Sequence, residues 1–346
     1  MPADRCGRTG RLPILTSVIR VFSGRMEVTM ADLKRSFHGA VCFEEKEGYI
    51  IPLRFSEAQM DHLSHSEFFK SRARCGASVI LKLLTEATRI SFAYKFFFRT
   101  EVKSSFEIYT NGLLTHVIHD DELQDEGTLD FSFEKGSKQI EIYIPHYSEA
   151  GIKDLRTDAD VAPIPDKEPR VLFIGDSITQ GYGSRSSSQT FVNIVARAMD
   201  YEIFNQGIGG FGFDQNIVQK LPCIPDKIVV ALGTNHYHGW SQTATRASIE
   251  AFFERLCKQY PDIETLVILP PYTGREQEKE GQEAYEFIRR AIVETVAAYP
   301  TVDRVSAYEM IPHRVDHFEQ DFLHPSPLGM SAYGKALIDE IRRIGF

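Results

Sequence analysis

Cysteine is scarce in this 346-residue sequence and is not arranged for metal binding or crosslinking. No two cysteines show CxxC spacing, and their number is odd. Disulfide frameworks and zinc sites need paired spacings, so reduced thiols in a cytoplasmic protein are expected, with secretion left open. The five cysteines, all far apart in the chain, are Cys6, Cys42, Cys75, Cys223 and Cys257.

Long hydrophobic runs and an excess of basic residues are also missing. No apolar run approaches the roughly 20 residues that a membrane-spanning helix needs. The chain has 39 Lys and Arg residues against 48 Asp and Glu residues, a formal net charge of -9. Nucleic acids and anionic membrane surfaces are bound by clustered basic residues, so neither is an expected partner.

The first 30 residues carry no readable function. Their apolar stretch at 12–19 is broken by Thr16 and Ser17, and no clear small-residue cleavage site follows it. This pattern disfavours a signal peptide, although it does not remove that alternative. We predict a disordered extension over residues 1–30.

The pattern of apolar and polar residues in the remaining sequence changes near residue 150. The length of the chain favours two domains. Residues 31–150 hold short runs rich in Ile, Phe, Tyr and Val, separated by turn signals such as Asn111-Gly112. Such runs are typical of antiparallel strands, and we predict a jelly-roll-like β-sandwich with a short helical interruption at 56–70. The polar stretch 151–169 contains Pro163, Pro165 and Pro169, and we predict an interdomain linker there.

From residue 170 onward, buried apolar runs alternate with amphipathic helical patterns. VLFIG, EIFNQG, KIVVALG, TLVILP and VDRVSAY are the strand candidates. This alternation is the signature of a parallel sheet with helices on both faces. We therefore predict the α/β class, with a five-stranded, doubly wound α/β/α domain over residues 170–346.

Residues suited to acyl transfer follow these predicted strands. In a parallel sheet, ligands bind at the carboxyl ends of the strands, so residues placed there are the first functional candidates. Ser177 leaves the first strand in GDSITQGYG, Gly210 ends NQGIGG after the second, and Asn235 follows the third in GTNHYHGW. Near the C-terminus, Asp321 and His324 stand three residues apart in QDFLHPSP.

Each of these residue types has a chemical reason to be there. A serine hydroxyl becomes nucleophilic when a base such as His324 takes its proton, and an aspartate such as Asp321 orients that base. A Ser-His dyad without the aspartate is an alternative. The N–H groups of Ser177 and Gly210 and the amide of Asn235 are candidate oxyanion donors, with Gly209 as an alternative to Gly210.

The four blocks GDS, IGG, GTN and DFLH resemble those of SGNH (GDSL-like) hydrolases in order and spacing. The resemblance covers the second domain and implies a serine esterase without a metal or an organic cofactor. An α/β-hydrolase elbow would need GxSxG, which is not found at Ser177. A β-sandwich before such a domain is also similar to family two carbohydrate esterases. One departure is His236, since the residue after the block's Asn is often Asp.

Residues beside these blocks are candidates for contacting substrate. Aromatic faces commonly stack on sugar rings or shape an acyl pocket, although packing alone also explains them. The candidates are Asp176, His236, Tyr237, Trp240 and Tyr272. The pairs His236/His238 and His313/His317 have spacings that suit two metal ligands but lack an evident third, so no metal is expected.

These features together predict an acylhydrolase that removes a short acyl group, acetyl by preference, from a hydroxyl of a small carbohydrate or oligosaccharide. Two alternatives stay open. A lipid esterase or thioesterase would need a wide apolar acyl groove. A glycan-binding protein with a vestigial hydrolase domain would not need the complete set of catalytic residues. The identity of the sugar and the oligomeric state are set by loops and surfaces that the sequence does not reveal.

Overall fold

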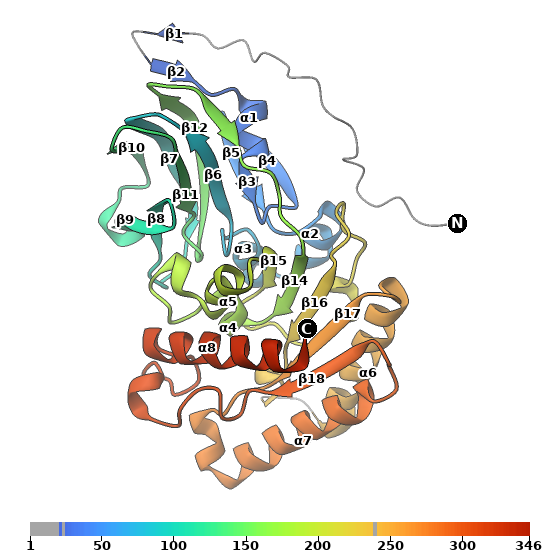
Figure 1. Ribbon diagram of the computed structural model, residues 1–346. Coiled ribbons are helices and arrows are strands. Elements are labelled where there is room, and N and C mark those ends of the chain that lie inside the picture. Colours follow the sequence, from blue (N-terminus) through green and yellow to red (C-terminus); the bar gives the residue numbers. More distant parts are fainter. Residues whose placement is uncertain (1–20, 23–24, 238–240) are drawn as a thin grey trace.

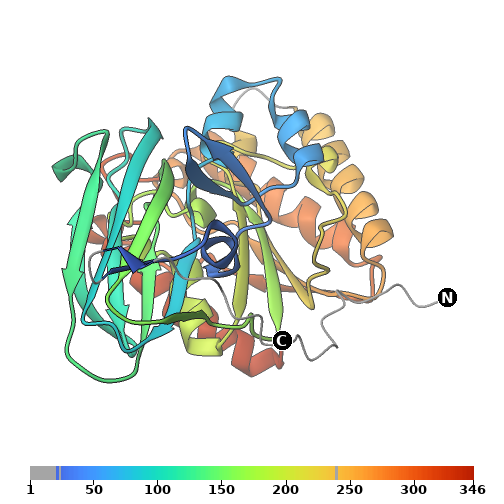
Figure 2. The same ribbon diagram turned by 90° about the horizontal axis from the view of Figure 1, so that it is seen from above.

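The computed structural model describes residues 21–22, 25–237 and 241–346. Figure 1 shows a β-rich N-terminal domain above a C-terminal domain whose sheet is covered by helices. In Figure 2 the strands coloured cyan to green lie on one side of the molecule, and the orange helices α6 (Gln242–Gln259) and α7 (Lys279–Val296) lie on the other.

The N-terminal domain consists of two antiparallel sheets, as the sequence predicted. One sheet has the order β1 (Val21–Phe22), β2 (Arg25–Glu27), β12 (Ser148–Thr157), β5 (Tyr49–Leu53) and β4 (Cys42–Lys46), with β7 (Arg89–Arg99) paired to β12 and β10 (Glu126–Ser132) paired to β7. The other has the order β13 (Val161–Pro163), β6 (Ile80–Thr85), β11 (Lys138–Tyr143), β8 (Ser105–Thr110) and β9 (Leu113–His119), with β3 (Phe37–His38) on β6.

Alternating side chains build the core between these sheets. Ile140 and Ile142 of β11 are fully buried, whereas Gln139 and Glu141, which alternate with them, are partly exposed. Asn111 and Gly112 both have positive φ angles, 51° and 78°, which is the backbone that a tight β8–β9 hairpin requires. The predicted β-sandwich is confirmed.

The segment predicted as a linker is largely sheet, so the prediction of a linker over 151–169 was wrong. Strand β12 continues to Thr157, and residues 161–163 form β13. Pro163 fits there because β13 is the edge strand of its sheet, where a missing backbone N–H costs no ladder hydrogen bond. Residues 25–27 of the predicted disordered extension also form a strand that pairs with β12.

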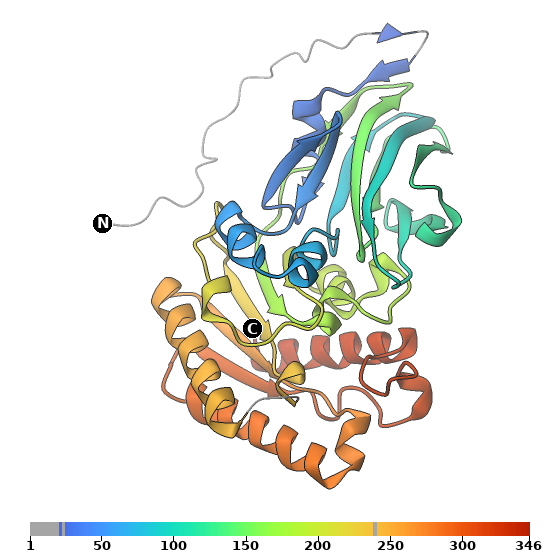
Figure 3. The same cartoon turned by 180° about the vertical axis from the view of Figure 1, so that it is seen from behind.

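Three short helices belong to the N-terminal part: α1 (Met30–Arg35), α2 (Glu57–Leu63) and α3 (Glu67–Ala73). The serines Ser56 and Ser66 cap α2 and α3, which replace the single helical interruption that was predicted. Figure 3 shows α2 and α3, in light blue, between the β-sandwich and the C-terminal domain. Phe55, Leu63 and Ala73 are buried in the hydrophobic core of that second domain.

The C-terminal domain has the predicted α/β/α architecture within the described residues. Its parallel sheet has the order β15 (Glu202–Gly207), β14 (Arg170–Gly175), β16 (Lys227–Ala231), β17 (Glu264–Leu269) and β18 (Val302–Ser306). Its other helices are α4 (Ser177–Gln180), α5 (Phe191–Met199) and α8 (Pro327–Ile344).

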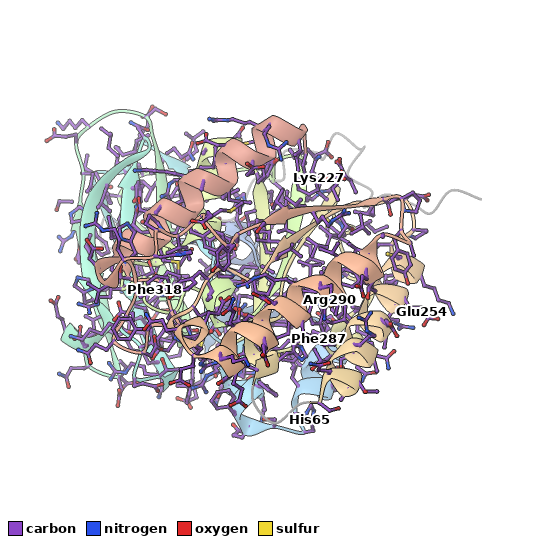
Figure 4. All side chains as sticks on the ribbon, turned by 90° about the horizontal axis from the view of Figure 1, so that it is seen from below. His65, Lys227, Glu254, Phe287, Arg290 and Phe318 are labelled. Carbon is purple, nitrogen blue, oxygen red and sulfur yellow. The ribbon has the colours of Figure 1, made fainter. Side chains whose placement is uncertain are left out.

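Apolar side chains bind two helix layers to this sheet. Alternate residues of β14 pack against α5 and α8 on one face and against α6 and α7 on the other. Figure 4 views the domain from below, with Phe287 and Arg290 on α7 and Glu254 on α6.

In the part of the chain that the structure describes, no helix is long and apolar enough to span a membrane. The N-terminal domain has one 3-10 turn among the described residues, η1 (Asp120–Glu122), between β9 and β10. In the described part of the C-terminal domain the 3-10 turns are η2 (Ser187–Gln189), η3 (Gln215–Ile217), η4 (Thr234–Tyr237), η5 (Gly274–Gln277) and η6 (Val315–His317).

Candidate active site

Ser177 begins helix α4 directly after strand β14, at the carboxyl end of the parallel sheet. Its Oγ lies 2.7 Å from Nε2 of His324, although 147 positions separate the two residues. The turn is tightly packed: a Cβ on Gly207, at the end of β15, would lie 2.4 Å from the backbone nitrogen of Gln180. Glycine is therefore required there for the serine turn and the neighbouring strand end to approach each other.

Asp321 holds His324 from its other ring nitrogen. The Asp321 Oδ2 lies 2.5 Å from His324 Nδ1, while its Oδ1 accepts the backbone N–H groups of Leu323 and His324 at 3.0 Å. Partial burial opposes ionisation of Asp321, but these hydrogen bonds outweigh it and lower its pKa to about 2. The Ser326 side chain caps α8 and Pro327 occupies its first turn, as predicted, which makes the connection after His324 short and stiff.

Tyr182 is a site residue that the sequence analysis missed. Its ring stacks on the imidazole of His324, with centroids 3.9 Å apart and an interplanar angle of 29°. Tyr147, from the N-terminal domain, packs edge-on against Tyr182 and donates a hydrogen bond to the Ser177 carbonyl at 3.3 Å. Tyr182 stands inside the GDSITQGYG motif, but no spacing rule identifies a ring that stacks on a base 142 positions away.

The backbone distinguishes the two glycines that the sequence left as alternatives. The Gly209 N–H donates to Oε1 of Gln180 at 2.8 Å, so this N–H group already has a hydrogen-bond acceptor within the protein. The Gly210 N–H makes no hydrogen bond to any described residue, and Gly210 has a φ angle of 78°, in the left-handed region. Asn235 donates one amide hydrogen to the Phe211 carbonyl at 2.9 Å, which orients its side chain and leaves a second hydrogen to donate.

A cavity of about 580 Å³ opens beside Gly210 and Asn235. Three phenylalanines contribute to its wall: Phe69 from α3, and Phe211 and Phe213 from the loop after β15. A cavity of this size that combines aromatic walls with a few polar groups is typical of a small-molecule site. His324 and Tyr182 do not line it.

Residues 173–332 match the model of the GDSL-like lipase/acylhydrolase family. The matched residues lie within the C-terminal domain. The match starts inside β14 and ends inside α8, so it contains all four blocks that suggested this family. An acylhydrolase of this family is an esterase, and the arrangement of Ser177, His324 and Asp321 suits that chemistry.

Known proteins resemble this chain in sequence or in fold. The human platelet-activating factor acetylhydrolase IB subunit alpha1 is 28% identical over 201 residues, which cover 53% of this chain and 80% of that protein. The structure of a salicylyl-acyltransferase from a tetracycline biosynthetic pathway has a TM-score of 0.82 at 17% identity, covering 94% of this chain and 99% of the other. A family two carbohydrate esterase from Clostridium thermocellum, in complex with cellohexaose, has a TM-score of 0.63 at 16% identity, covering 78% and 94%. At such identities the structural likeness establishes the fold.

A buried arginine of the N-terminal domain binds the end of strand β15, which precedes the loop that contains Gly210. Arg54 is fully buried and donates to the carbonyls of Asn205 and Gly207 in β15 at 2.6 and 3.0 Å. It also donates to the carbonyls of Arg72 and Cys75, at 2.9 and 2.6 Å. Burial lowers the pKa of Arg54 to about 10, so it stays charged at neutral pH. This residue connects α3 to the strand that precedes Gly210.

Three of the predicted substrate contacts make contacts within the protein. Asp176 is 2% exposed and caps α4 by accepting the Ile178 N–H, and burial raises its pKa to about 6. Tyr237 stacks on Tyr285 at 5.8 Å, and Tyr272 stacks on His313 at 3.9 Å. Their role as substrate contacts stays a prediction. Trp240 lies outside the described residues.

His236 lines the cavity at its buried end. Its Nε2 accepts the Phe213 N–H at 2.8 Å, and its ring stacks on that of Phe213 at 5.3 Å. Burial lowers the pKa of His236 to about 4, so the ring is neutral at pH 7. Of the predicted contacts that the structure describes, His236 is the one that borders the cavity.

Of the two histidine pairs considered as metal ligands, only His313/His317 lies wholly within the described residues. His238 lies outside the described residues, and His317 pairs with Asp316 at 2.8 Å rather than with His313. A different group, His38, Asp166 and Glu202, lies close enough together to hold an ion. There, however, His38 Nδ1 lies 2.9 Å from a Glu202 oxygen, and its Nε2 lies 3.0 Å from the Ile164 carbonyl. Both ring nitrogens of His38 are thus engaged by Glu202 and a backbone carbonyl, so hydrogen bonding within the protein explains this cluster.

Replacing Asn235 by alanine is expected to lower kcat for ester hydrolysis by about 10²- to 10³-fold, the usual loss when one oxyanion donor is removed. KM should change much less, because the donor interacts most strongly with the charge that develops in the transition state. Steady-state kinetics on p-nitrophenyl acetate measures both parameters. The Asn235→Asp variant keeps the side-chain shape but has no N–H to donate, so it should lose a similar factor. Near-wild-type kcat in both variants would show that Asn235 is not an oxyanion donor.

Proposed function

We propose that the chain is a serine esterase that removes short acyl groups, acetyl foremost, from carbohydrate hydroxyls. The observation that carries this proposal is the connected chain of hydrogen bonds from Ser177 Oγ through His324 to Asp321. Ser177 Oγ adds to the ester carbonyl while His324 Nε2 takes its proton, and Asp321 stabilises the imidazolium that forms. The N–H groups of Ser177 and Gly210 and the second amide hydrogen of Asn235 then bind the oxyanion.

The intermediate collapses when His324 returns the proton to the leaving alcohol oxygen and the carbon–oxygen bond breaks. This leaves an acyl group on Ser177 Oγ. Water, deprotonated by His324, hydrolyses that ester and regenerates the serine. Since every group in this cycle comes from the chain itself, the proposal needs no metal and no organic cofactor.

The substrate part of the proposal rests on the similar proteins. The human relative's name describes removal of an acetyl group, and the carbohydrate esterase with the same two-domain fold was crystallised with an oligosaccharide. Phe68 of α3 adds an aromatic surface at the site: it is 49% exposed, and a Cβ on Gly210 would lie 3.0 Å from its ring. An exposed aromatic face at the site entrance suits contact with a sugar ring.

We expect the protein to hydrolyse p-nitrophenyl acetate and butyrate, and p-nitrophenyl octanoate at least about 10-fold less efficiently. A long apolar chain has to lie against the polar residues of η3, which also line the cavity, and this lowers its binding. The measurement is kcat/KM across the three esters, followed by acetate release from acetylated xylo- and cello-oligosaccharides. Efficiency that rises with chain length would overturn the short-acyl assignment, and no release from any acetylated sugar would overturn the carbohydrate assignment.

A lipid esterase is the second candidate. The aromatic cavity beside Gly210 favours it, as does the name of the human relative, which refers to a lipid mediator. Octanoate turnover above acetate in the ester series would select this candidate. A glycan-binding protein without catalysis is disfavoured. Ser177 lies within hydrogen-bonding distance of His324, and His324 lies within hydrogen-bonding distance of Asp321.

A further inference from the structure

The cavity beside Gly210 and Asn235 is much larger than an acetyl group. Its volume is about 580 Å³. Helix α6 contributes small side chains to the lining: Ala247, Ser248 and Ala251. Small side chains and phenylalanines together line a wide space. The oxyanion donors stand at one edge of this space.

The position of His324 decides which part of an ester can enter the cavity. The carbonyl carbon bonded to Ser177 carries two other substituents besides the oxyanion: the leaving oxygen and the acyl chain. The leaving oxygen has to lie against His324 Nε2, which protonates it. Neither His324 nor Tyr182, which stacks on it, lines the cavity, whereas the donors Gly210 and Asn235 do. The cavity is therefore on the acyl side of the reacting carbon.

The lining also restricts the chemistry of what binds there. His236 at the buried end is neutral at pH 7, because burial lowers its pKa to about 4. Asp214, the carboxylate at the cavity, already pairs with Nε2 of His62 at 2.6 Å and accepts the Asn216 N–H. A charged acyl group would find no partner of opposite charge among the lining residues, and an apolar one would contact the phenylalanine rings.

We propose that this cavity is the acyl subsite of the esterase and that it admits uncharged acyl groups bulkier than acetyl, such as butyryl and benzoyl. This inference rests on the proposed esterase function and extends it, because it assigns the acyl specificity to the surface between α6 and the loop after β15. Acetyl occupies the entrance of the subsite next to the oxyanion donors. A larger acyl group extends along Phe211 toward Ala251.

The test is to fill the subsite from α6. Ala251→Phe should lower kcat/KM for p-nitrophenyl butyrate and benzoate by about 10-fold or more, while acetate changes by less than about 2-fold. Ala251→Leu should give a smaller loss of kcat/KM, again larger for butyrate and benzoate than for acetate. Ala244→Phe is the matched control, since Ala244 is exposed on the same helix and does not line the cavity. All three esters should behave as in the wild type for this control.

Two results would overturn the inference. One is a wild-type enzyme that hydrolyses acetate but neither butyrate nor benzoate. The other is an equal effect of Ala251→Phe on all three esters in a protein that still unfolds cooperatively at the wild-type temperature. Failure of the esterase proposal is a different outcome, since the Ser177→Ala protein would then keep its activity toward acetate.

Discussion

Replacing Ser177 by alanine is expected to abolish ester hydrolysis, with kcat falling on the order of 10⁵- to 10⁶-fold, the loss seen when a serine nucleophile is removed from a triad. Without the hydroxyl no acyl-enzyme forms, and the remaining oxyanion donors supply only a small residual rate. The measurement is kcat for p-nitrophenyl acetate, combined with labelling by a fluorophosphonate probe, which should modify the wild type at Ser177 and leave the variant unlabelled.

Ser184→Ala is a suitable control for this variant. Its hydroxyl is also buried and donates to the Ser186 carbonyl at 2.7 Å, but it is not part of the hydrogen-bonded chain. The control should keep its activity and probe labelling. Activity near the wild-type level in Ser177→Ala, with an unchanged thermal unfolding temperature, would refute the nucleophile assignment and with it the proposed mechanism.

Replacing Asp321 by asparagine should lower kcat by roughly 10³- to 10⁴-fold while the fold is preserved. The asparagine oxygen can still accept the N–H groups of Leu323 and His324, so the loop keeps its hydrogen bonds. The amide nitrogen, however, now faces His324 Nδ1 and donates to it. This reverses the tautomer, so that Nε2 carries a proton toward Ser177 and cannot accept one.

The same loop offers a matched control in a second aspartate–histidine pair. Asp316 Oδ1 lies 2.8 Å from Nδ1 of His317, and this pair does not contact Ser177. Asp316→Asn should therefore leave kcat within about 2-fold of the wild type, because Asp316 is exposed and lies outside the hydrogen-bonded chain from Ser177 to Asp321. Equal losses in the two variants would indicate that loop structure, rather than the tautomer of His324, explains the effect of Asp321.

The low pKa of Asp321 also determines how the Asp321–His324 pair responds to acid. Its folded-state pKa of about 2 lies below the ordinary value of 3.8, so the carboxylate form is favoured by the fold. The interaction with His324 is present above the ordinary pKa and is lost as the pH falls through about 2. If kcat/KM rises or falls with pH between pH 4 and 9, that change must then come from the titration of a group other than Asp321.

Part of the fold could be predicted because its signals are local. Strand and helix periods, the turn at Asn111-Gly112 and the Ser326-Pro327 helix start each depend on a few consecutive residues. The linker prediction failed for the opposite reason. A polar segment with prolines looks the same in sequence whether it crosses solvent or pairs as the edge strand β13, and only its partner β6 distinguishes the two.

For the site, the sequence alone predicted which residues carry the chemistry and that they meet at one edge of the sheet. Ser177, Asn235, Asp321 and His324 were identified because each block follows a strand or precedes a helix. Only the tertiary structure decided that the Gly209 N–H donates to Gln180, that Tyr182 stacks on His324, and that Arg54 binds the end of β15. These contacts join residues far apart in the chain, and distance along a sequence carries no information about which side chains meet across a domain interface.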